Sequence, residues 1–422
     1  MNISEKGICL MKKKQKYFRY SEQHLWLQVL GVIVGVLCLH ISSAEAIWLG
    51  QFQVNPFLEL QGIYDTNIFR VSDDQEKDRD FITVISPGIH FEFPTSQDPT
   101  FRAVANYRSS IRLYGNDGDS KVDPKGELNT NDHRLDGHLY FTFASGLRFT
   151  TGYILSLDSK PPDFRGDTRD GYADHAFLVQ TAYAFADRYE IQLGYSGSLR
   201  SYDDSCNKDD NYATHQGETT LFYRIFPKLS VLGGGSYALT SREEPVFSDS
   251  KQYAGYGGFR YEATEQLTAT MKIGALHKDF DARDVDDTTQ VYASGETQAV
   301  FSDTSSLNVQ LYRNIGETSL TDESNVYGAY YVRTGVHARM TYGLPALPNT
   351  SFIGDLGYTR ETYPEDAKDR SDDSLEIGVG VDYKFLKFFV IGVKYQYSSA
   401  DSTINTKDFT DHVAMIKIRA IL

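Results

Sequence analysis

The chain has 422 residues, with 42 lysine and arginine side chains against 57 aspartate and glutamate side chains, which gives a net charge of −15. This balance argues against nucleic acid as a partner, because phosphate binding needs a basic surface. After residue 46 no run of about 18 apolar residues occurs, which excludes a protein that crosses a membrane with helices.

Residues 1–46 are predicted to form a cleaved signal peptide. A basic region from Lys12 to Arg19 precedes an apolar stretch from Leu25 to Ile41, and Ala44-Glu45-Ala46 offers a small-x-small cleavage site. Translation from Met11 is an alternative start. Removal of residues 1–46 would take away six of the 42 basic and three of the 57 acidic side chains, leaving 36 against 54 and a net charge of −18.

The remaining residues, 47–422, show no linker or shift in composition and are predicted to form a single domain. Its clearest segment is LEIGVGVDYKF at residues 375–385. Alternate residues of a strand point to opposite faces, so Leu375, Ile377 and Val379 share an apolar face while Glu376 and Asp382 lie on the other. This pattern recurs along nearly the whole chain and favours strands with one face in lipid and one in water.

An aromatic residue, a tight polar turn and an alternating strand repeat at intervals of 35 to 43 residues, from Phe143 to Phe385. A period near forty fits either propeller blades or two membrane strands with one short turn and one long loop. Long acidic stretches lie between the short turns, for example around residues 73–80 and 365–373, and no blade signature is present. The sequence therefore predicts an all-β fold, an antiparallel transmembrane β-barrel with short periplasmic turns and long acidic extracellular loops. We expect about eighteen strands, with sixteen as the alternative, at residues 52–65, 80–93, 100–114, 132–144, 147–158, 173–185, 189–202, 212–225, 229–241, 250–262, 267–280, 288–301, 306–318, 327–342, 350–362, 374–385, 387–399 and 409–422.

Aromatic residues close the strands at the short-turn end, where a membrane-interface girdle belongs. A looser second set is expected at the loop end. Its members are Tyr202, Tyr212, Tyr253, Phe280, Tyr327, Tyr397 and Phe409.

The polar face of each strand is expected to line the lumen, because charges facing lipid near the midplane would cost about 2–4 kcal/mol each. Arg102, Arg108 and Arg112 occupy alternate positions of one strand. They could form a track for an anionic solute, or they could pair with Glu59, Asp136 and other wall carboxylates. The predicted pore-lining residues are Arg102, Arg108, Arg112, Arg134, Arg148, Arg224, Arg260, Lys272, Arg333, Arg339, Lys384, Lys394, Glu218, Glu296 and Asp382.

The sequence gives no sign of catalysis. The eight histidines after residue 46 are scattered, and His133 and His138 fall on opposite faces of one strand, so a regular strand cannot bring them to one metal. No acidic stretch has the spacing of an EF-hand loop. We expect no metal site, no cofactor and no enzymatic activity.

The stretch FLELQGIYDTNIFR, an acidic segment and DFITVISPGIHFEFP together resemble the opening of an outer-membrane β-barrel porin family associated with exopolysaccharide or capsule loci of Gram-negative bacteria. The segment from Tyr64 to Ile68, followed by Ser86-Pro87-Gly88, carries the most specific part of the likeness. The resemblance implies an outer-membrane location and a role in polysaccharide secretion.

The leading functional prediction is a porin-like channel linked to exopolysaccharide or capsule secretion. The alternatives are a non-conducting barrel that binds a partner through its acidic loops and, remotely, a barrel enzyme. The expected partners are outer-membrane lipid, the outer-membrane assembly machinery, and polysaccharide or polysaccharide-export proteins.

Overall fold

The computed structural model describes residues 47–94, 100–117, 128–160, 170–202, 211–243, 249–264, 266–281, 285–317, 330–364, 369–385, 388–403 and 408–421. The predicted signal peptide therefore lies outside the described residues. In the described part no helix is long and apolar enough to cross a membrane.

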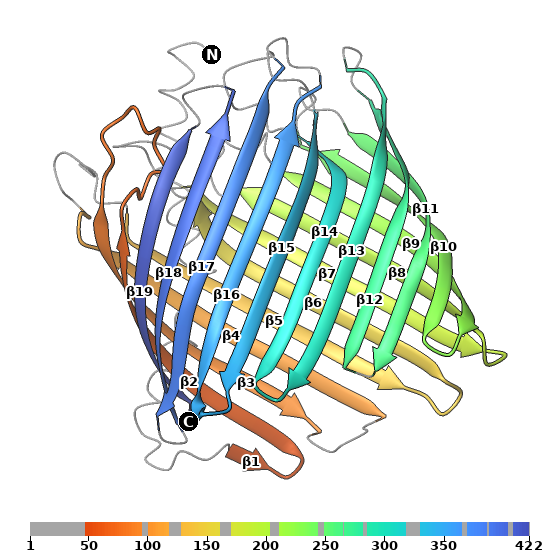
Figure 1. The fold of residues 1–422 in the computed structure, drawn as a ribbon, viewed down its shortest axis with the longest axis horizontal. Coiled ribbons are helices and arrows are strands. Elements are labelled where there is room, and N and C mark those ends of the chain that lie inside the picture. Colours follow the sequence, from red (N-terminus) through yellow and green to blue (C-terminus); the bar gives the residue numbers. More distant parts are fainter. Residues whose placement is uncertain are drawn as a thin grey trace.

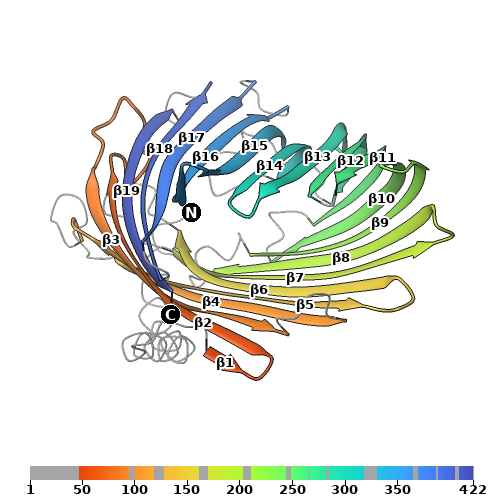
Figure 2. The same ribbon diagram turned by 60° about the horizontal axis from the view of Figure 1, so that its bottom comes forward.

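The described residues form one antiparallel sheet that closes on itself (Figures 1 and 2). Each strand from β2 to β18 pairs with the next, and β19 pairs back onto β2, from Val413 opposite Asp65 to Ile421 opposite Phe57. Closure leaves no edge with unpaired backbone groups, which is what a strand-built protein needs in lipid. The eighteen wall strands are β2 (Phe52–Asp65), β3 (Asp80–Phe93), β4 (Phe101–Tyr114), β5 (Thr130–Thr142), β6 (Leu147–Lys160), β7 (Asp170–Phe185), β8 (Tyr189–Tyr202), β9 (Tyr212–Phe226), β10 (Leu229–Arg242), β11 (Ser250–Thr264), β12 (Leu267–Phe280), β13 (Thr288–Ser302), β14 (Ser305–Glu317), β15 (Tyr330–Leu344), β16 (Leu347–Thr362), β17 (Ser371–Phe385), β18 (Phe389–Ser402) and β19 (Phe409–Ile421).

The prediction of a closed barrel of about eighteen strands is confirmed. The sequence did not predict β1 (Ile47–Leu49), a short strand that pairs with β2 outside the wall (Figure 2). It carries only three residues and shows no alternation long enough to be recognised.

The two ends of the barrel differ. Turns at residues 143–146, 186–188, 227–228, 303–304 and 345–346 join strands at the lower end in Figure 1, near the C-terminus. We call this the turn end, and the opposite end the loop end.

Residues 66–79, one of the predicted acidic loops, connect β2 to β3 at the loop end and are held against β19. The fully buried Asn67 donates hydrogen bonds to the carbonyl oxygens of Val71 (2.9 Å) and Thr410 (3.2 Å). Lys77 Nζ donates to Thr410 Oγ1 (2.6 Å) and pairs with Asp73 (2.6 Å), and its hydrogen bond lowers the pKa of the Asp73 carboxyl. These contacts tie the loop across the seam where β19 meets β2.

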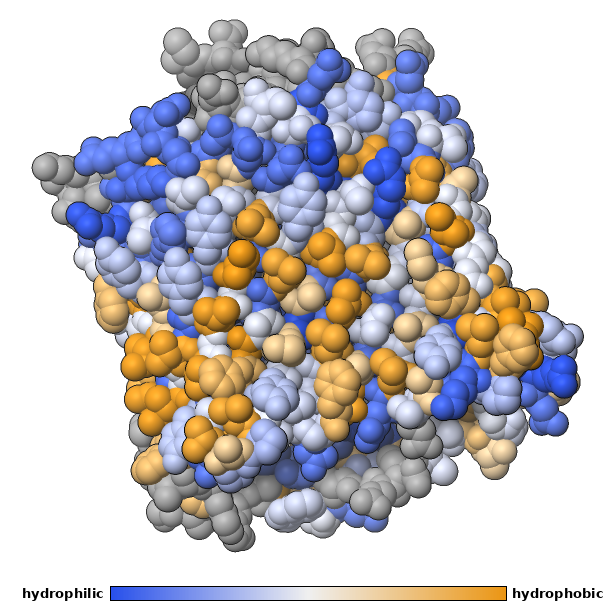
Figure 3. Space-filling model, in the orientation of Figure 1, coloured by the Kyte–Doolittle hydropathy of each residue, from blue (hydrophilic) through white to orange (hydrophobic). Residues whose placement is uncertain are grey.

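The outer face of the barrel is apolar. Ile273, Val379 and Val393 are 56–58% exposed, and the apolar side chains gather in a band across the middle and lower part of the face seen in Figure 3. A continuous apolar belt of this size on a closed barrel is a lipid-facing surface. The predicted face of β17 is confirmed, since Ile377, Val379, Val381, Tyr383 and Phe385 are all strongly exposed.

The aromatic girdle at the turn end is confirmed, with Phe143, Phe226, Phe301 and Tyr342 all 45–65% exposed. The second aromatic set, expected at the loop end, is confirmed only in part. Tyr253 and Tyr397 share the outer face, but Tyr327 lies outside the described residues. By register Phe280, Tyr202, Tyr212 and Phe409 lie on the inner face, because their alternation continues that of inward residues.

Candidate functional site: the inner wall

Residues paired across neighbouring strands lie on the same face of the sheet. Once one residue is known to point inward, the register therefore gives the face of every other residue in the wall. Arg108 on β4 reaches past β3 to Glu59 on β2, with Nη2 at 2.9 Å from Oε1, and Arg260 on β11 reaches Glu190 on β8 at 2.9 Å. Contacts that skip one or more strands occur on the concave side. Glu59 and its register partners therefore mark the inner face.

Carried strand by strand around the closed sheet, the register places every predicted pore-lining residue on this inner face. They are Arg102, Arg108 and Arg112 on β4, Arg134 on β5, Arg148 on β6, Glu218 and Arg224 on β9, Arg260 on β11, Lys272 on β12, Glu296 on β13, Arg333 and Arg339 on β15, Asp382 and Lys384 on β17, and Lys394 on β18.

The three arginines of β4 are paired with carboxylates. Arg102 contacts Glu92 at 2.8 Å, Arg108 contacts Glu59 at 2.9 Å, and Arg112 pairs with Asp132. Asp136, one of the acids expected to pair with these arginines, instead accepts a hydrogen bond from Asn106 at 2.7 Å. The β4 arginines thus satisfy wall carboxylates instead of standing as an unneutralised track.

The same pairing extends around the wall. Glu190 Oε2 accepts from Arg148 at 2.8 Å and its Oε1 from Arg260 at 2.9 Å. Lys272 pairs with Glu218 at 2.7 Å. On the opposite side Asp355 lies between Lys394 (3.0 Å) and Arg339 (3.6 Å), and Lys417 pairs with Asp382 at 2.9 Å.

Three of the predicted pore-lining cations have no carboxylate partner among the described residues. Arg134 donates to Ser156 Oγ at 3.4 Å, Arg224 donates to the carbonyl oxygen of Asp187 at 3.4 Å, and Lys384 has no ion pair in that part of the chain. The side chains of all three are exposed. The lumen is therefore hydrated where these charges lie.

The wall departs from a simple cylinder at the loop end of β14 and β15. β13 pairs with β14 only from Ala293 opposite Arg313 down to the turn, although β13 continues upward to Thr288 alongside β12. By register Ile315 and Val332 share the outward face of Leu311, which is 47% exposed. Both are nevertheless buried.

The residues that bury them lie on the inner face of the neighbouring wall. Ile315, Val332 and Tyr330 pack in one cluster with Leu276 and Phe280 of β12, together with Ala254 of β11. Tyr330 donates a hydrogen bond to Thr288 Oγ1 at 2.9 Å. The loop-end segment Arg313–Glu317 with Tyr330–Thr334, which we call the inner flap, therefore lies inside the barrel against β10–β13.

A buried charge cluster fixes the inner flap. Glu317 accepts hydrogen bonds from Arg242 Nη2 at 2.7 Å and from Ser250 Oγ at 2.5 Å, and it pairs with Lys278 Nζ at 2.6 Å. The side chains of Arg242, Lys278 and Glu317 are only 10%, 6% and 13% exposed. On the other face of the flap Arg333 pairs with Glu361 at 2.7 Å and is 41% exposed.

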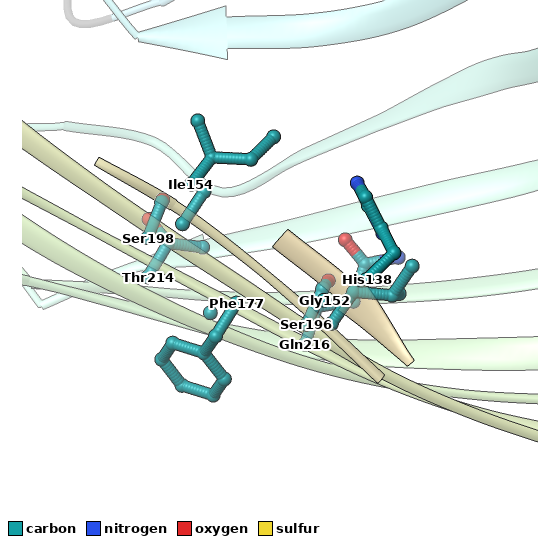
Figure 4. Close-up of a pocket in the computed structure, with 11 residues that line it drawn as sticks. His138, Gly152, Ile154, Phe177, Ser196, Ser198, Thr214 and Gln216 are labelled. Carbon is teal, nitrogen blue, oxygen red and sulfur yellow. The ribbon is translucent and has the colours of Figure 1, made fainter. Parts of the chain in front are cut away.

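A concavity of about 340 Å³ occupies the inner surface of β5–β9. Its lining combines His138 and the neutral donors and acceptors Ser196, Ser198, Thr214 and Gln216 with the apolar residues Ile154, Ala176, Phe177 and Leu178. Figure 4 shows His138 and Ile154 projecting from one side of the sheet, whereas Phe177 projects from the other. The surface between the charge pairs can therefore hydrogen-bond hydroxyl groups without a net charge.

The described residues contain no group of three or more histidine, cysteine, aspartate or glutamate side chains placed to hold a metal. Sequence reasoning missed the inner flap and its Glu317 cluster, because the alternation assigns Ile315 and Glu317 to the lipid side. The sequence did contain one signal. Glu317 falls on the alternate positions that face lipid, where a charged side chain is unfavourable.

The geometry agrees with the family comparison. Residues 236–421 match the model of the family described as Putative beta-barrel porin 2, which covers the wall from β10 to β19. The C-terminal part of the chain is therefore similar to a family of β-barrel porins, and the closed sheet with its apolar outer face agrees with a location in the outer membrane.

The barrel is also similar to several solved structures. A BenF-like porin from Pseudomonas fluorescens Pf-5 is 12% identical, with a TM-score of 0.46 over 89% of this chain and 100% of that one. OpdK of Pseudomonas aeruginosa, solved with vanillate, is 12% identical with a TM-score of 0.45 over 87% and 99% of the two chains. OccAB4 of Acinetobacter baumannii is 12% identical with a TM-score of 0.44 over 87% and 98%. No curated protein matches the chain.

Proposed function

We propose that this outer-membrane barrel conducts anionic solutes and serves exopolysaccharide or capsule secretion. The observation that carries the proposal is that three exposed cations of the inner face, Arg134, Arg224 and Lys384, have no carboxylate partner in the described wall. Eighteen strands give a circumference at which barrels hold an aqueous channel. The barrel and the family match point to a channel and not to an enzyme.

The polysaccharide part of the proposal is supported by the neutral concavity on β5–β9. Hydroxyl and amide groups of Ser196, Ser198, Thr214 and Gln216 can exchange hydrogen bonds with sugar hydroxyls, and the nearby cations can attract carboxylates of acidic sugars. The resemblance of residues 57–94 to porins of exopolysaccharide loci points the same way.

The inner flap favours a second candidate, a barrel that does not conduct. The flap occupies inner-wall space at the loop end and is fixed by the Glu317 cluster. A flap that stays closed would leave the acidic loops as the functional surface.

Planar-bilayer recording on the refolded protein tests the channel. Stable conductance steps with anion preference are expected, and the double change Arg134→Glu and Arg224→Glu should move the reversal potential toward cation preference. Two reversed charges act in a water-filled, weakly screened lumen, so we expect a several-fold change in the permeability ratio.

The matched control exchanges a neutralised pair, Arg108→Glu with Glu59→Arg, which reverses two charges on the same wall without altering its net charge. This variant should retain the selectivity of the unaltered protein. The absence of conductance steps from protein that migrates as a folded barrel would instead support the non-conducting candidate.

The polysaccharide role has its own test. Oligosaccharides rich in uronic acid, added to a conducting channel, should interrupt the current, and the Arg134→Glu and Arg224→Glu variant should be blocked less. Equal block by neutral oligosaccharides would contradict a preference for acidic sugars while leaving the channel itself intact.

A further inference from the structure

The histidines of the barrel are divided between its two faces in a regular way. His90, His138 and His337 lie on the inner face, and the other five lie on the outer face. All five outer histidines stand three to five residues from the loop end of their strands, at the border of the apolar belt. They are His133, His175, His215, His277 and His412.

Four of these imidazoles meet a tyrosine hydroxyl of the adjacent strand. The Oη to Nδ1 distances are 2.7 Å for Tyr153 and His175, 2.8 Å for Tyr195 and His215, and 2.7 Å for Tyr395 and His412. A fourth pair, Tyr107 with His133, is buried at 3.0 Å. Each pair sits diagonally across two strands joined at the loop end, so the same geometry recurs in four hairpins.

The pairs on β6–β9 form a continuous surface. Phe177 lies between them, with its ring 5.4 Å from that of Tyr195 and 6.3 Å from that of His215. Tyr153 and Tyr195 are 42% and 40% exposed on the lipid side. The two histidines are two strands apart, which corresponds to about 10 Å.

This surface changes charge only through its histidines. The loop-end halves of the outer face of β6–β10 contain tyrosine, leucine, glycine, alanine, serine, threonine, valine and phenylalanine, but no Asp, Glu, Lys or Arg. The titratable groups facing His175 and His215 are the hydroxyl groups of Tyr153, Tyr195 and Tyr237. Protonation of the two imidazoles therefore adds positive charge with no acid on this face to cancel it.

The hydrogen bond orients each imidazole in both protonation states. When Nδ1 accepts from the tyrosine hydroxyl, the neutral ring carries its proton on Nε2, and the imidazolium can donate Nδ1–H to the tyrosine oxygen instead. In either state Nε2–H is left as a donor that the tyrosine does not use. At the border between lipid and water, the hydrogen-bond acceptor that best suits the positively charged Nε2–H donor is a lipid phosphate group.

We propose that the two Tyr–His pairs of β6–β9 form a proton-sensitive contact site for the phosphate of an anionic lipid headgroup at the loop-end border of the membrane. Charge complementarity selects this occupant, because the face offers only neutral groups and protonatable imidazoles, placed where headgroups lie. The site holds lipid more tightly on acidification, when the imidazoles gain positive charge.

The test uses the full barrel in nanodiscs of phosphatidylcholine with a minor fraction of phosphatidic acid. Native mass spectrometry measures phosphatidic acid retained per barrel at about pH 7.5 and about pH 5.5, on either side of the ordinary histidine pKa. Retention should rise about 5- to 30-fold on acidification. Each positive charge beside an anionic lipid surface strengthens binding about as much as a surface lysine does, and protonation of the two histidines adds one or two such charges. The variant His175→Gln with His215→Gln should lose this rise.

The matched control is His138→Gln with His337→Gln, which removes two histidines from the inner face and should keep the full rise. If the outer double variant does not fold, each single variant is measured and should lose part of the rise. An unchanged rise in the outer variants, an equal loss in the inner control, or no preference for phosphatidic acid over phosphatidylcholine would each overturn the proposal.

Discussion

Replacing Glu317 by glutamine should release the inner flap from the barrel wall. The change leaves Arg242 and Lys278 buried without their carboxylate, and removing one partner of a buried ion cluster typically costs about 3–5 kcal/mol. Backbone amides of the flap should then exchange hydrogen much faster than in the unaltered protein.

Hydrogen exchange read by mass spectrometry measures this directly, with bilayer recording beside it. If the flap narrows the lumen, its release should also raise the conductance of single channels. The matched control is Glu361→Gln, which breaks the more exposed pair with Arg333 on the other face of the same segment and should cost about 1 kcal/mol or less. Slow exchange retained in the Glu317 variant would show that the cluster does not hold the flap.

Introducing lysine at Val379 should strongly impair folding into lipid. Val379 lies near the middle of β17 and is 56% exposed on the outer face. A lysine facing hydrocarbon near the midplane costs about 2–4 kcal/mol in barrels of this kind. The measurement is the free energy of unfolding, from reversible denaturant titration in vesicles.

The control is Glu376→Lys, three residues earlier on the same strand and on the inner face. It changes the charge by two units where Val379→Lys changes it by one, yet it points to water and should alter the free energy of unfolding far less. Equal destabilisation by the two changes would contradict the assignment of faces on which the site and the channel proposal rest.

Much of the inner wall could be predicted from the sequence. Because strand residues alternate strictly between two faces, recognising the apolar side of a segment such as residues 375–385 also places Asp382 and Lys384 in the lumen. The partners of those charges could not be predicted as well. Arg102 pairs with Glu92 on the neighbouring strand, and Asp136 binds Asn106 and not one of the β4 arginines, because register and side-chain reach decide between several nearby acids.

The histidines illustrate a different limit. In sequence they are scattered and fall in no motif. Pairing of consecutive strands brings Tyr153 beside His175 and Tyr195 beside His215, in a register that the sequence does not reveal. Their common feature in sequence, a histidine on the apolar phase close to a loop, is visible only once the strand ends are known.

The amino-acid sequence by itself determined the class of fold, the approximate strands and the face of most residues, since period-two alternation and aromatic strand ends follow from the chemistry of lipid and water. Only the tertiary structure decided which part of the wall turns into the interior of the barrel. Ile315 and Glu317 are in phase with lipid-facing residues, but the loss of pairing between β13 and β14 lets their segment pack on the inner face of β10–β13. Alternation is a local property, whereas burial depends on which surface a strand meets after the barrel has closed.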